Sequence, residues 1–341
     1  MFYKIHNITK KNRRVKKYKN NKRILKESCD KISNENQLIN KINKNFPILK
    51  KNKENIKYTI YPYCNEKTKI GFNLDYVNRP IIKKKLLNKL KKEYNYNYTF
   101  NKNIIKSDNK YYISPKTNSE LFYNYISYKK NDKLIVSHSN FMTDFFEYIY
   151  SNLLQENKKH KTKVIFDNLD IIQLIILPNT KNNSPNNIIM GLIIRRYKNN
   201  YKENIIYINS DKYNKNIKLK ELYHSDSRMV NMFLIRHCVG CHNLISNKLI
   251  KTYKALRPSQ KGHLKMAICI KETQLELNKK IKPLHKLFKD FSKSKYTFDN
   301  YYGYKFGSSI LFRSILTMLL IFNTVFVEKK SLKNKTRKNK K

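Results

Sequence analysis

Glycine and tryptophan are scarce in this chain, which has only six glycines and no tryptophan among 341 residues. A phosphate-binding loop of the P-loop type needs several closely spaced glycines, and no such segment is present. The sequence also lacks a cluster of aspartates with the spacing of metal ligands. We therefore expect neither a P-loop nucleotide hydrolase nor a bound metal ion or other cofactor.

Acidic residues are few as well, because 24 Asp and Glu stand against 73 Lys and Arg and the formal net charge is +49. A basic excess is typical of proteins that bind nucleic acid. Part of it lies at the ends, since residues 1–57 carry 18 basic and 4 acidic residues and residues 328–341 carry 8 and 1. Asn, Ile and Tyr are also abundant, which fits the codon bias of an AT-rich genome. Charge alone therefore does not identify a partner.

Long apolar runs are missing too. The longest, from Ile315 to Val327, is interrupted by Asn323 and is shorter than the roughly 20 residues that a membrane-spanning helix needs. The start of the chain has no apolar core of the secretory type. An odd set of cysteines without a regular framework favours a reducing compartment. We expect an intracellular protein, with the cytoplasm favoured, and no membrane span.

One short pattern, Cys238-Val239-Gly240-Cys241-His242, matches the motif for covalent haem attachment. Haem attachment would need a specialised compartment and a second axial ligand, and the sequence indicates neither. A zinc site would need four ligands, and no second Cys-x-x-Cys pair is present. Both interpretations are therefore set aside.

The chain divides into two globular blocks. Residues 1–55 form a basic, polar extension, residues 56–197 the first block, residues 198–230 a polar connector, residues 231–327 the second block, and residues 328–341 a Lys-rich tail. β-branched apolar runs predict strands, and apolar residues at helical spacing predict helices. The expected strands are 58–61, 133–137, 164–166, 171–177, 188–194, 205–208, 233–235, 306–311 and 324–327. The expected helices are 81–94, 118–128, 141–154, 262–290 with an interruption near Pro283, and 312–322. This alternation predicts an α/β fold with a mostly parallel central sheet and helices on both faces.

Two of the expected strands end in a histidine motif. Arg236-His237 follows the apolar run 232–235, and Ser137-His138 follows the run 134–136. Open α/β sheets place their functional sites at the carboxyl ends of parallel strands. An Arg-His and a Ser-His at such positions resemble the paired motifs of the histidine phosphatase superfamily, which has the phosphoglycerate-mutase-like fold.

The resemblance implies a role for each motif residue. His237 is the candidate nucleophile, with Arg236 beside it as a phosphate clamp and Asn243 as a further phosphate contact. The segment 308–317 is similar to the family's Ser-Ser-x-x-x-Arg-x-x-x-Thr motif and implies that Arg313 is the second clamp. His138 would be the second clamp histidine. A neutral imidazole surrounded by donors that neutralise phosphoryl oxygens is what transfer to histidine requires, and the planar fork of arginine suits phosphate.

Further matches and departures lie close to these residues. The segment 61–66 resembles the family segment that delivers a carboxylic acid, which implies that Glu66 protonates the leaving group. The turn 258–262 looks like the one before the family's first long helix. Cys238 and Ser139 stand where the family usually has glycine.

The two halves occur in reversed order. The Arg-His motif normally opens the domain, whereas here residues 232–327 followed by residues 58–194 give one complete domain. A circular permutation explains this order easily, because domain termini often lie close together at the surface. A decayed tandem pair and a rearranged gene are the alternatives.

The leading hypothesis is a metal-independent phosphatase or mutase that works through phosphohistidine on an unidentified phosphorylated small molecule or phosphoprotein. One alternative is a catalytically inactive relative that serves as a binding protein. Another is a nucleic-acid-binding protein, because Lys and Tyr interleave at 11–26 and 91–98.

Overall fold

The computed structural model describes thirteen stretches of the chain and one isolated residue. They are residues 35–51, 56–61, 64, 88–89, 91–94, 96–100, 115–127, 131–154, 164–178, 187–209, 218–239, 270–292, 303–309 and 311–327. The turn expected at 258–262, the first part of the helix expected at 262–290 and both basic ends lie outside these residues. Of the helix expected at 81–94, residues 88–89 and 91–94 are described, and they are helical.

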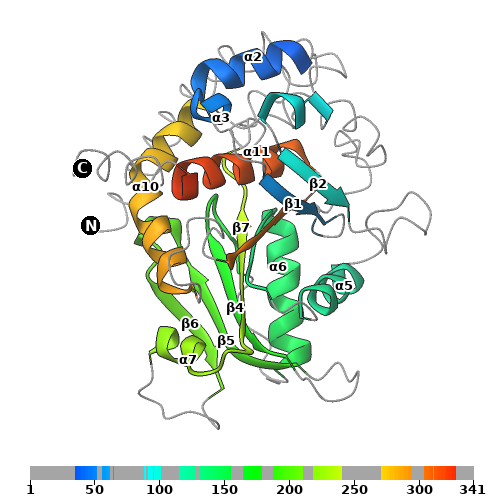
Figure 1. Cartoon of the computed structure of the whole chain (residues 1–341). Coiled ribbons are helices and arrows are strands. Elements are labelled where there is room, and N and C mark those ends of the chain that lie inside the picture. Colours follow the sequence, from blue (N-terminus) through cyan, green and yellow to red (C-terminus); the bar gives the residue numbers. More distant parts are fainter. Residues whose placement is uncertain are drawn as a thin grey trace, which may run out of the picture.

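The fold is built on one eight-stranded sheet with the order β2-β1-β8-β3-β7-β4-β5-β6 (Figure 1). Five strands, β2, β1, β8, β3 and β7, are parallel to one another, and β4, β5 and β6 continue the sheet in antiparallel pairs. The prediction of a mostly parallel sheet is therefore confirmed, with an antiparallel extension that it did not include. The strands are β1 (Ile56–Ile60), β2 (Tyr96–Phe100), β3 (Lys133–Ser137), β4 (Ile171–Leu177), β5 (Ile188–Arg195), β6 (Glu203–Ile208), β7 (Val230–Arg236) and β8 (Lys305–Ser308).

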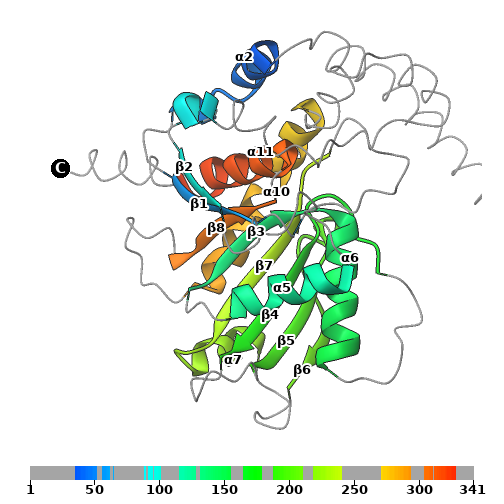
Figure 2. The same ribbon diagram turned by 90° about the vertical axis from the view of Figure 1, so that its right-hand side faces the viewer.

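Strands from the two sequence blocks alternate in this sheet. β8, from the second block, lies between β1 and β3 of the first block, and β3 in turn lies between β8 and β7 (Figure 2). Neither block can therefore form the parallel part of the sheet without the other.

Helices cover both faces of the sheet, as predicted. In Figure 2, α5 and α6 lie in front of the sheet and α10 passes behind it, while α11 lies above β1 and β8 and shares an apolar cluster with α10. The α-helices are α2 (Glu35–Asn45), α3 (Ile48–Lys51), α5 (Pro115–Ser127), α6 (Ser139–Tyr148), α7 (Leu219–Ser225), α10 (Ile270–Asp290) and α11 (Phe312–Ile321). The π-helical turns η4 (Ile149–Leu153) and η9 (Phe322–Val327) extend α6 and α11, and η5 (Tyr197–Asn199) is a 3₁₀ turn. No helix among the described residues is long and apolar enough to cross a membrane.

The side chains of the central strands divide between two apolar clusters, one on each face. In β7, Phe233 and Ile235 pack with α10 and α11, whereas Met232 and Leu234 pack with α5 and α6. Successive strand residues point to opposite faces, so a strand covered on both sides must be apolar throughout. Helix packing on both faces thus explains why β3, β4 and β7 read as continuous apolar runs.

Two of the predicted strands are wrong. Residues 324–327 belong to the π-helical turn η9, where Val325 and Phe326 are buried without pairing to the sheet. Residues 164–166 join no ladder, because side chains bind their carbonyl groups instead, as the hydroxyl of Thr143 does at the oxygen of Val164 (2.8 Å). Val164 and Phe166 in the first segment and Val325 and Phe326 in the second are buried and apolar, a property that strands share with buried turns.

Other boundaries differ from the predictions in smaller ways. α5 begins at Pro115 rather than near residue 118, which fits the preference of proline for the first helical turn. Pro283 lies inside α10 without ending it. An interior proline costs about 3 kcal/mol, and the burial of Leu284, Leu287 and Phe288 against the core offsets that cost. α7 was not expected, although Leu219, Leu222 and Tyr223 have helical spacing.

Candidate functional site

The two motif histidines meet at the carboxyl ends of β3 and β7. These strands are parallel neighbours in which Ser137 pairs with Arg236, so that His138 and His237 leave the sheet side by side. Their ring centroids are 4.9 Å apart at an interplanar angle of 61°. Both side chains are buried, with exposed fractions of 0% and 1%. The strand register therefore brings together two imidazoles that are far apart in the sequence.

Arg313 lies in contact with both rings. It is the second residue of α11 and is fully buried. Its Nε donates to Nε2 of His237 (3.1 Å), and one of its terminal nitrogens lies 3.3 Å from Nδ1 of His138. A single guanidinium thus connects the two histidines.

These contacts define the protonation of His237. A guanidinium only donates hydrogen bonds, so Nε2 of His237 must accept through its lone pair. The ring proton is then on Nδ1, which lies 2.6 Å from the carbonyl oxygen of Cys238 and donates to it. His237 is therefore a neutral imidazole whose unprotonated nitrogen, Nε2, faces Arg313.

The same reasoning applies to His138. Its Nδ1 accepts from Arg313, so its proton is on Nε2, which lies 2.6 Å from the hydroxyl of Ser309 and 3.2 Å from that of Ser314. The backbone N–H of Ser309 donates to the carbonyl oxygen of Val136 (2.9 Å), which joins the end of β8 to the end of β3. Three strand ends and the first turn of α11 therefore meet at this cluster.

Thr317 holds α11 in place against β7. Its hydroxyl accepts from the backbone N–H of Cys238 (3.0 Å) and donates to the carbonyl oxygen of Arg313 (2.7 Å). The helix carrying the arginine is thus fixed to the residue that follows the nucleophile candidate. The thiol of Cys238 is buried in the apolar core, and its backbone carbonyl and N–H groups bind His237 and Thr317.

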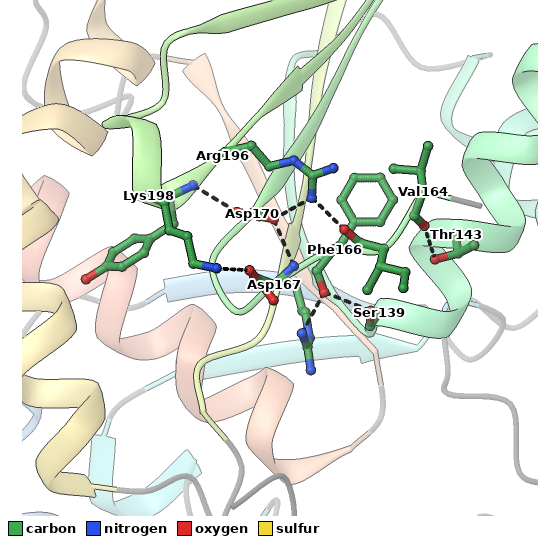
Figure 3. Close-up of polar contacts among 11 residues, drawn as sticks. Ser139, Thr143, Val164, Phe166, Asp167, Asp170, Arg196 and Lys198 are labelled. Atoms are coloured by element: carbon green, nitrogen blue, oxygen red, sulfur yellow. Dashed lines mark hydrogen bonds and ion pairs between the residues drawn. The ribbon is translucent and has the colours of Figure 1, made fainter. Parts of the chain in front are cut away.

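A loop formed by residues 164–170 packs against both histidine strands (Figure 3). The carbonyl oxygen of Phe166 accepts from the hydroxyl of Ser139 (2.9 Å) and from the guanidinium of Arg236 (2.6 Å). The side-chain amide of Asn168 donates to the carbonyl oxygen of His237 (2.8 Å). The residues next to His138 and His237 are therefore held by one segment.

Charged side chains hold this loop in shape. Asp170 accepts from the guanidinium of Arg196 (2.7 Å) and from the backbone N–H groups of Asp167 and Tyr197 (both 2.8 Å). Lys198 donates to Asp167 (2.7 Å), and this hydrogen bond is the main cause that lowers the pKa of the Asp167 carboxyl (Figure 3).

The structure brings together three of the six residues predicted for the site: His138, His237 and Arg313. Arg236 is half-buried and donates to the loop at Phe166. Asn243 and Glu66 lie outside the described residues. Cys64, two residues before Glu66, is buried, and its carbonyl oxygen accepts from the hydroxyl of Ser137 (2.6 Å).

Ser309, Ser314 and Thr317 were not predicted as site residues. All three belong to the segment 308–317, where polar residues interrupt an otherwise apolar run, and this interruption is a signal that could have identified them. Asn168 has no comparable signal, because its contact depends on the path of the loop.

Comparison with known proteins identifies no relative: no protein-family model, curated protein or solved structure matches the chain. Within the described residues, no group of three or more His, Cys, Asp or Glu side chains is placed to hold a metal ion. Any functional conclusion therefore depends on the geometry of the cluster itself.

Proposed function

We propose that the chain transfers phosphoryl groups through a phosphohistidine on His237, acting as a phosphatase or mutase on a phosphorylated small molecule or phosphoprotein. The observation that carries the proposal is the contact of one buried arginine, Arg313, with both His237 and His138. Neutral histidines and an arginine at the carboxyl ends of parallel strands form a site suited to a tetrahedral anion.

Binding of a phosphate requires one exchange of partners. Arg313 now donates to Nε2 of His237, and that lone pair must become available to phosphorus. A phosphoryl group offers oxygens that accept charge-assisted hydrogen bonds, which are stronger than a bond to a neutral imidazole. The guanidinium therefore moves from Nε2 to the phosphoryl oxygens when the anion enters.

The first chemical step forms a P–N bond. The lone pair on Nε2 of His237 attacks phosphorus, the P–O bond to the leaving group breaks, and Glu66 gives its proton to the departing oxygen. The ring becomes positively charged, and the hydrogen bond from its Nδ1–H to the Cys238 carbonyl oxygen stabilises that charge.

The second step regenerates the enzyme. Water attacks phosphorus, the Glu66 carboxylate takes the proton of that water, and the P–N bond breaks with its electron pair returning to Nε2. Inorganic phosphate leaves, or an acceptor alcohol in place of water gives a mutase. The assignment of Glu66 is supported by the hydrogen bond that Ser137, at the end of β3, donates to the carbonyl oxygen of Cys64.

Arg236 and Asn243 are assigned as additional phosphate contacts. For Arg236 this assignment requires its guanidinium to leave the carbonyl oxygen of Phe166 or to share its donors with it, which five N–H groups permit. The loop 164–170 then binds the Arg236 side chain whenever the site holds no phosphate.

We further propose that the domain is a circular permutation of the phosphoglycerate-mutase-like fold. The alternation of β1, β8, β3 and β7 supports it, because strands of both blocks are needed for one parallel sheet. The parallel pairing of β1 with β8 supports it as well, since it places the first strand of one block beside the last strand of the other.

The decisive experiment traps the phosphoenzyme. Full-length protein is mixed with ³²P-labelled p-nitrophenyl phosphate, quenched in alkali, in which phosphohistidine is stable, and digested to map the label. We expect labelling at His237 and its loss in His237→Asn, whose side-chain amide can still donate to the Cys238 carbonyl oxygen. His224→Asn, a change at an exposed histidine, serves as the matched control and should label normally. Wild-type protein with no label at His237 would refute the proposal.

One observation favours a second candidate, an inactive relative that binds phosphate. Arg313 donates to the nitrogen of His237 that would act as nucleophile, and a protein that kept this contact could hold an anion without reacting. Calorimetry with inorganic phosphate separates the two functions. Binding that depends on Arg313, in a protein that forms no phosphoenzyme, would support the inactive relative.

A further inference from the structure

A second cavity lies on the sheet away from the histidines. It has a volume of about 320 Å³ and is bordered by α5 and by the strands β2, β1, β8 and β3. Two of its residues, Lys133 and Lys305, are the first residues of β3 and β8, whereas His138 follows the last residue of β3. Five residues of strand span about 16 Å, so this cavity is separate from the proposed catalytic site.

The charges around the cavity have one sign. Lys57, Lys133 and Lys305 border it, and every charged side chain that the structure describes around it is a lysine. Lys133 and Lys305 are direct partners in the register of β3 and β8. Like charges directly opposite each other on neighbouring strands repel, and an anion placed between them removes that repulsion.

One of these lysines is buried. Lys133 is only 2% exposed, and its Nζ donates to the carbonyl oxygens of Ile126 (3.1 Å) and Asn131 (2.8 Å). The two carbonyl groups fix the ammonium group of Lys133 at the cavity wall.

Aromatic rings form another part of the wall. Tyr61 and Tyr125 meet edge to face with their centroids 5.3 Å apart, and Tyr125 is half-buried. Gly307 allows this arrangement, because a Cβ at that position would lie 2.3 Å from the ring of Tyr61. Tyr61 therefore packs closely on the sheet and supports Tyr125 from the side.

We propose that this cavity binds a nucleoside phosphate, either free or as one unit of a single-stranded nucleic acid. The lysines hold the phosphate, and the base stacks on Tyr125. Lysine side chains next to an aromatic surface bind nucleotides without base specificity. The volume is at the lower end of the range for small-ligand sites, which suits a mononucleotide. This proposal does not depend on the function proposed for the histidine cluster.

The first test uses adenosine 5′-monophosphate as the probe, with the full chain in a calorimeter at about 0.15 M salt, where diffuse attraction is screened. Adenosine is the same ligand without its phosphate, and ribose 5-phosphate is the same ligand without its base. We expect the whole nucleotide to bind about tenfold or more tightly than either half, because stacking and phosphate contacts both contribute. Equal affinity for the nucleotide and ribose 5-phosphate would overturn the assignment, and so would an absence of nucleotide binding.

Matched variants then separate this cavity from the general basic charge. K57Q/K305Q removes two positive charges at the cavity, and K220Q/K279Q removes two elsewhere, all four lysines being exposed. We expect about tenfold weaker nucleotide binding in the first pair alone. Equal effects in the two pairs would show that only net charge matters. Tyr125→Leu is a second test, and it should abolish the preference for the nucleotide over ribose 5-phosphate.

A further arm identifies the source of the nucleotide. A fluorescein-labelled decamer of deoxyadenylate is followed by anisotropy, with the mononucleotide as competitor. If the mononucleotide displaces the decamer and K57Q/K305Q weakens this displacement, the cavity binds single-stranded nucleic acid. If the mononucleotide binds without displacing the decamer, the cavity binds a free nucleotide. K57Q/K305Q should leave phosphoenzyme labelling at His237 unchanged, so failure of the phosphohistidine proposal is distinguishable from failure of this one.

Discussion

Nε of Arg313 lies 3.1 Å from Nε2 of His237 and donates a hydrogen bond to it. The positively charged guanidinium of Arg313 therefore binds the same nitrogen that the proposed reaction uses as its nucleophile. An incoming anion competes for the guanidinium, and success in that competition exposes the lone pair. Substrate binding and activation of His237 would then be one event, because both depend on the same side chain.

Arg313→Lys tests this coupling. Lysine keeps the charge but has no planar fork, so it cannot contact His237 and two phosphoryl oxygens in the same way. A charge-assisted hydrogen bond is worth about 1.5–3 kcal/mol, so we expect kcat/KM for p-nitrophenyl phosphate to fall by roughly 10- to 150-fold. Initial rates measure the effect, with Arg228→Lys, a change in an exposed pair with Asp226, as the control. Rates equal to wild type would contradict the role of the fork.

The central strands could be predicted from the sequence because their environment leaves a clear pattern. β3 and β4 have the predicted bounds, 133–137 and 171–177, since both are buried on two faces and end at polar or turn residues. The same criterion fails at 164–166 and 324–327, where apolar residues are buried in a loop and in a π-helical turn. The apolar composition of these two segments indicates burial, but their backbone hydrogen bonds determine whether they form strands.

The site could be predicted only in part, for a related reason. His138 and His237 meet because β3 and β7 are neighbours, and strand order is a property of the whole sheet. The contact of Arg236 with Phe166 depends on a loop in which Leu169 adopts a left-handed conformation (φ 63°). Leucine rarely adopts this conformation, so the sequence does not predict it. The sequence therefore identifies the types of residue at the site, but it does not identify the residues that they contact.

Asp167→Asn tests the electrostatics of that loop. The hydrogen bond from Lys198 lowers the pKa of Asp167 below its ordinary value of 3.8, so the pair stabilises the fold above that pH and loses its effect as pH falls through the folded-state pKa. The two side chains are 55% and 76% exposed, so the contribution at neutral pH should be only about 0.2–1 kcal/mol.

Chemical denaturation of wild type, Asp167→Asn, Lys198→Gln and the double variant at pH 7 measures this contribution as a double-mutant cycle. The difference between wild type and Asp167→Asn should shrink toward zero as the pH falls through the folded-state pKa of Asp167, which lies below 3.8. A coupling energy that stays constant down to acid pH would show that the pair does not act through the charge of Asp167.

Tyr223 and Asp132 form a buried pair near the starts of β3 and β7, at the opposite end of these strands from the loop, and Tyr223→Phe tests it. The Tyr223 hydroxyl donates to the carboxylate of Asp132, which also accepts from the backbone N–H of Asn231 (2.8 Å). Removing the hydroxyl deprives a buried carboxylate of a donor, so we expect the free energy of unfolding at pH 7 to fall by about 1.5–3 kcal/mol. Tyr148→Phe is the control, because the ring of Tyr148 is also buried and, among the described residues, its hydroxyl makes no hydrogen bond to a carboxylate.

Burial and the nearby Asp132 charge raise the pKa of Tyr223 above its ordinary value of 10, so its stabilising effect is complete below pH 10 and is lost as pH rises further. Denaturation curves at pH 7 and above pH 10 should therefore show a gap between wild type and variant that narrows in alkali, and a gap that widens would contradict the assignment of the proton to Tyr223.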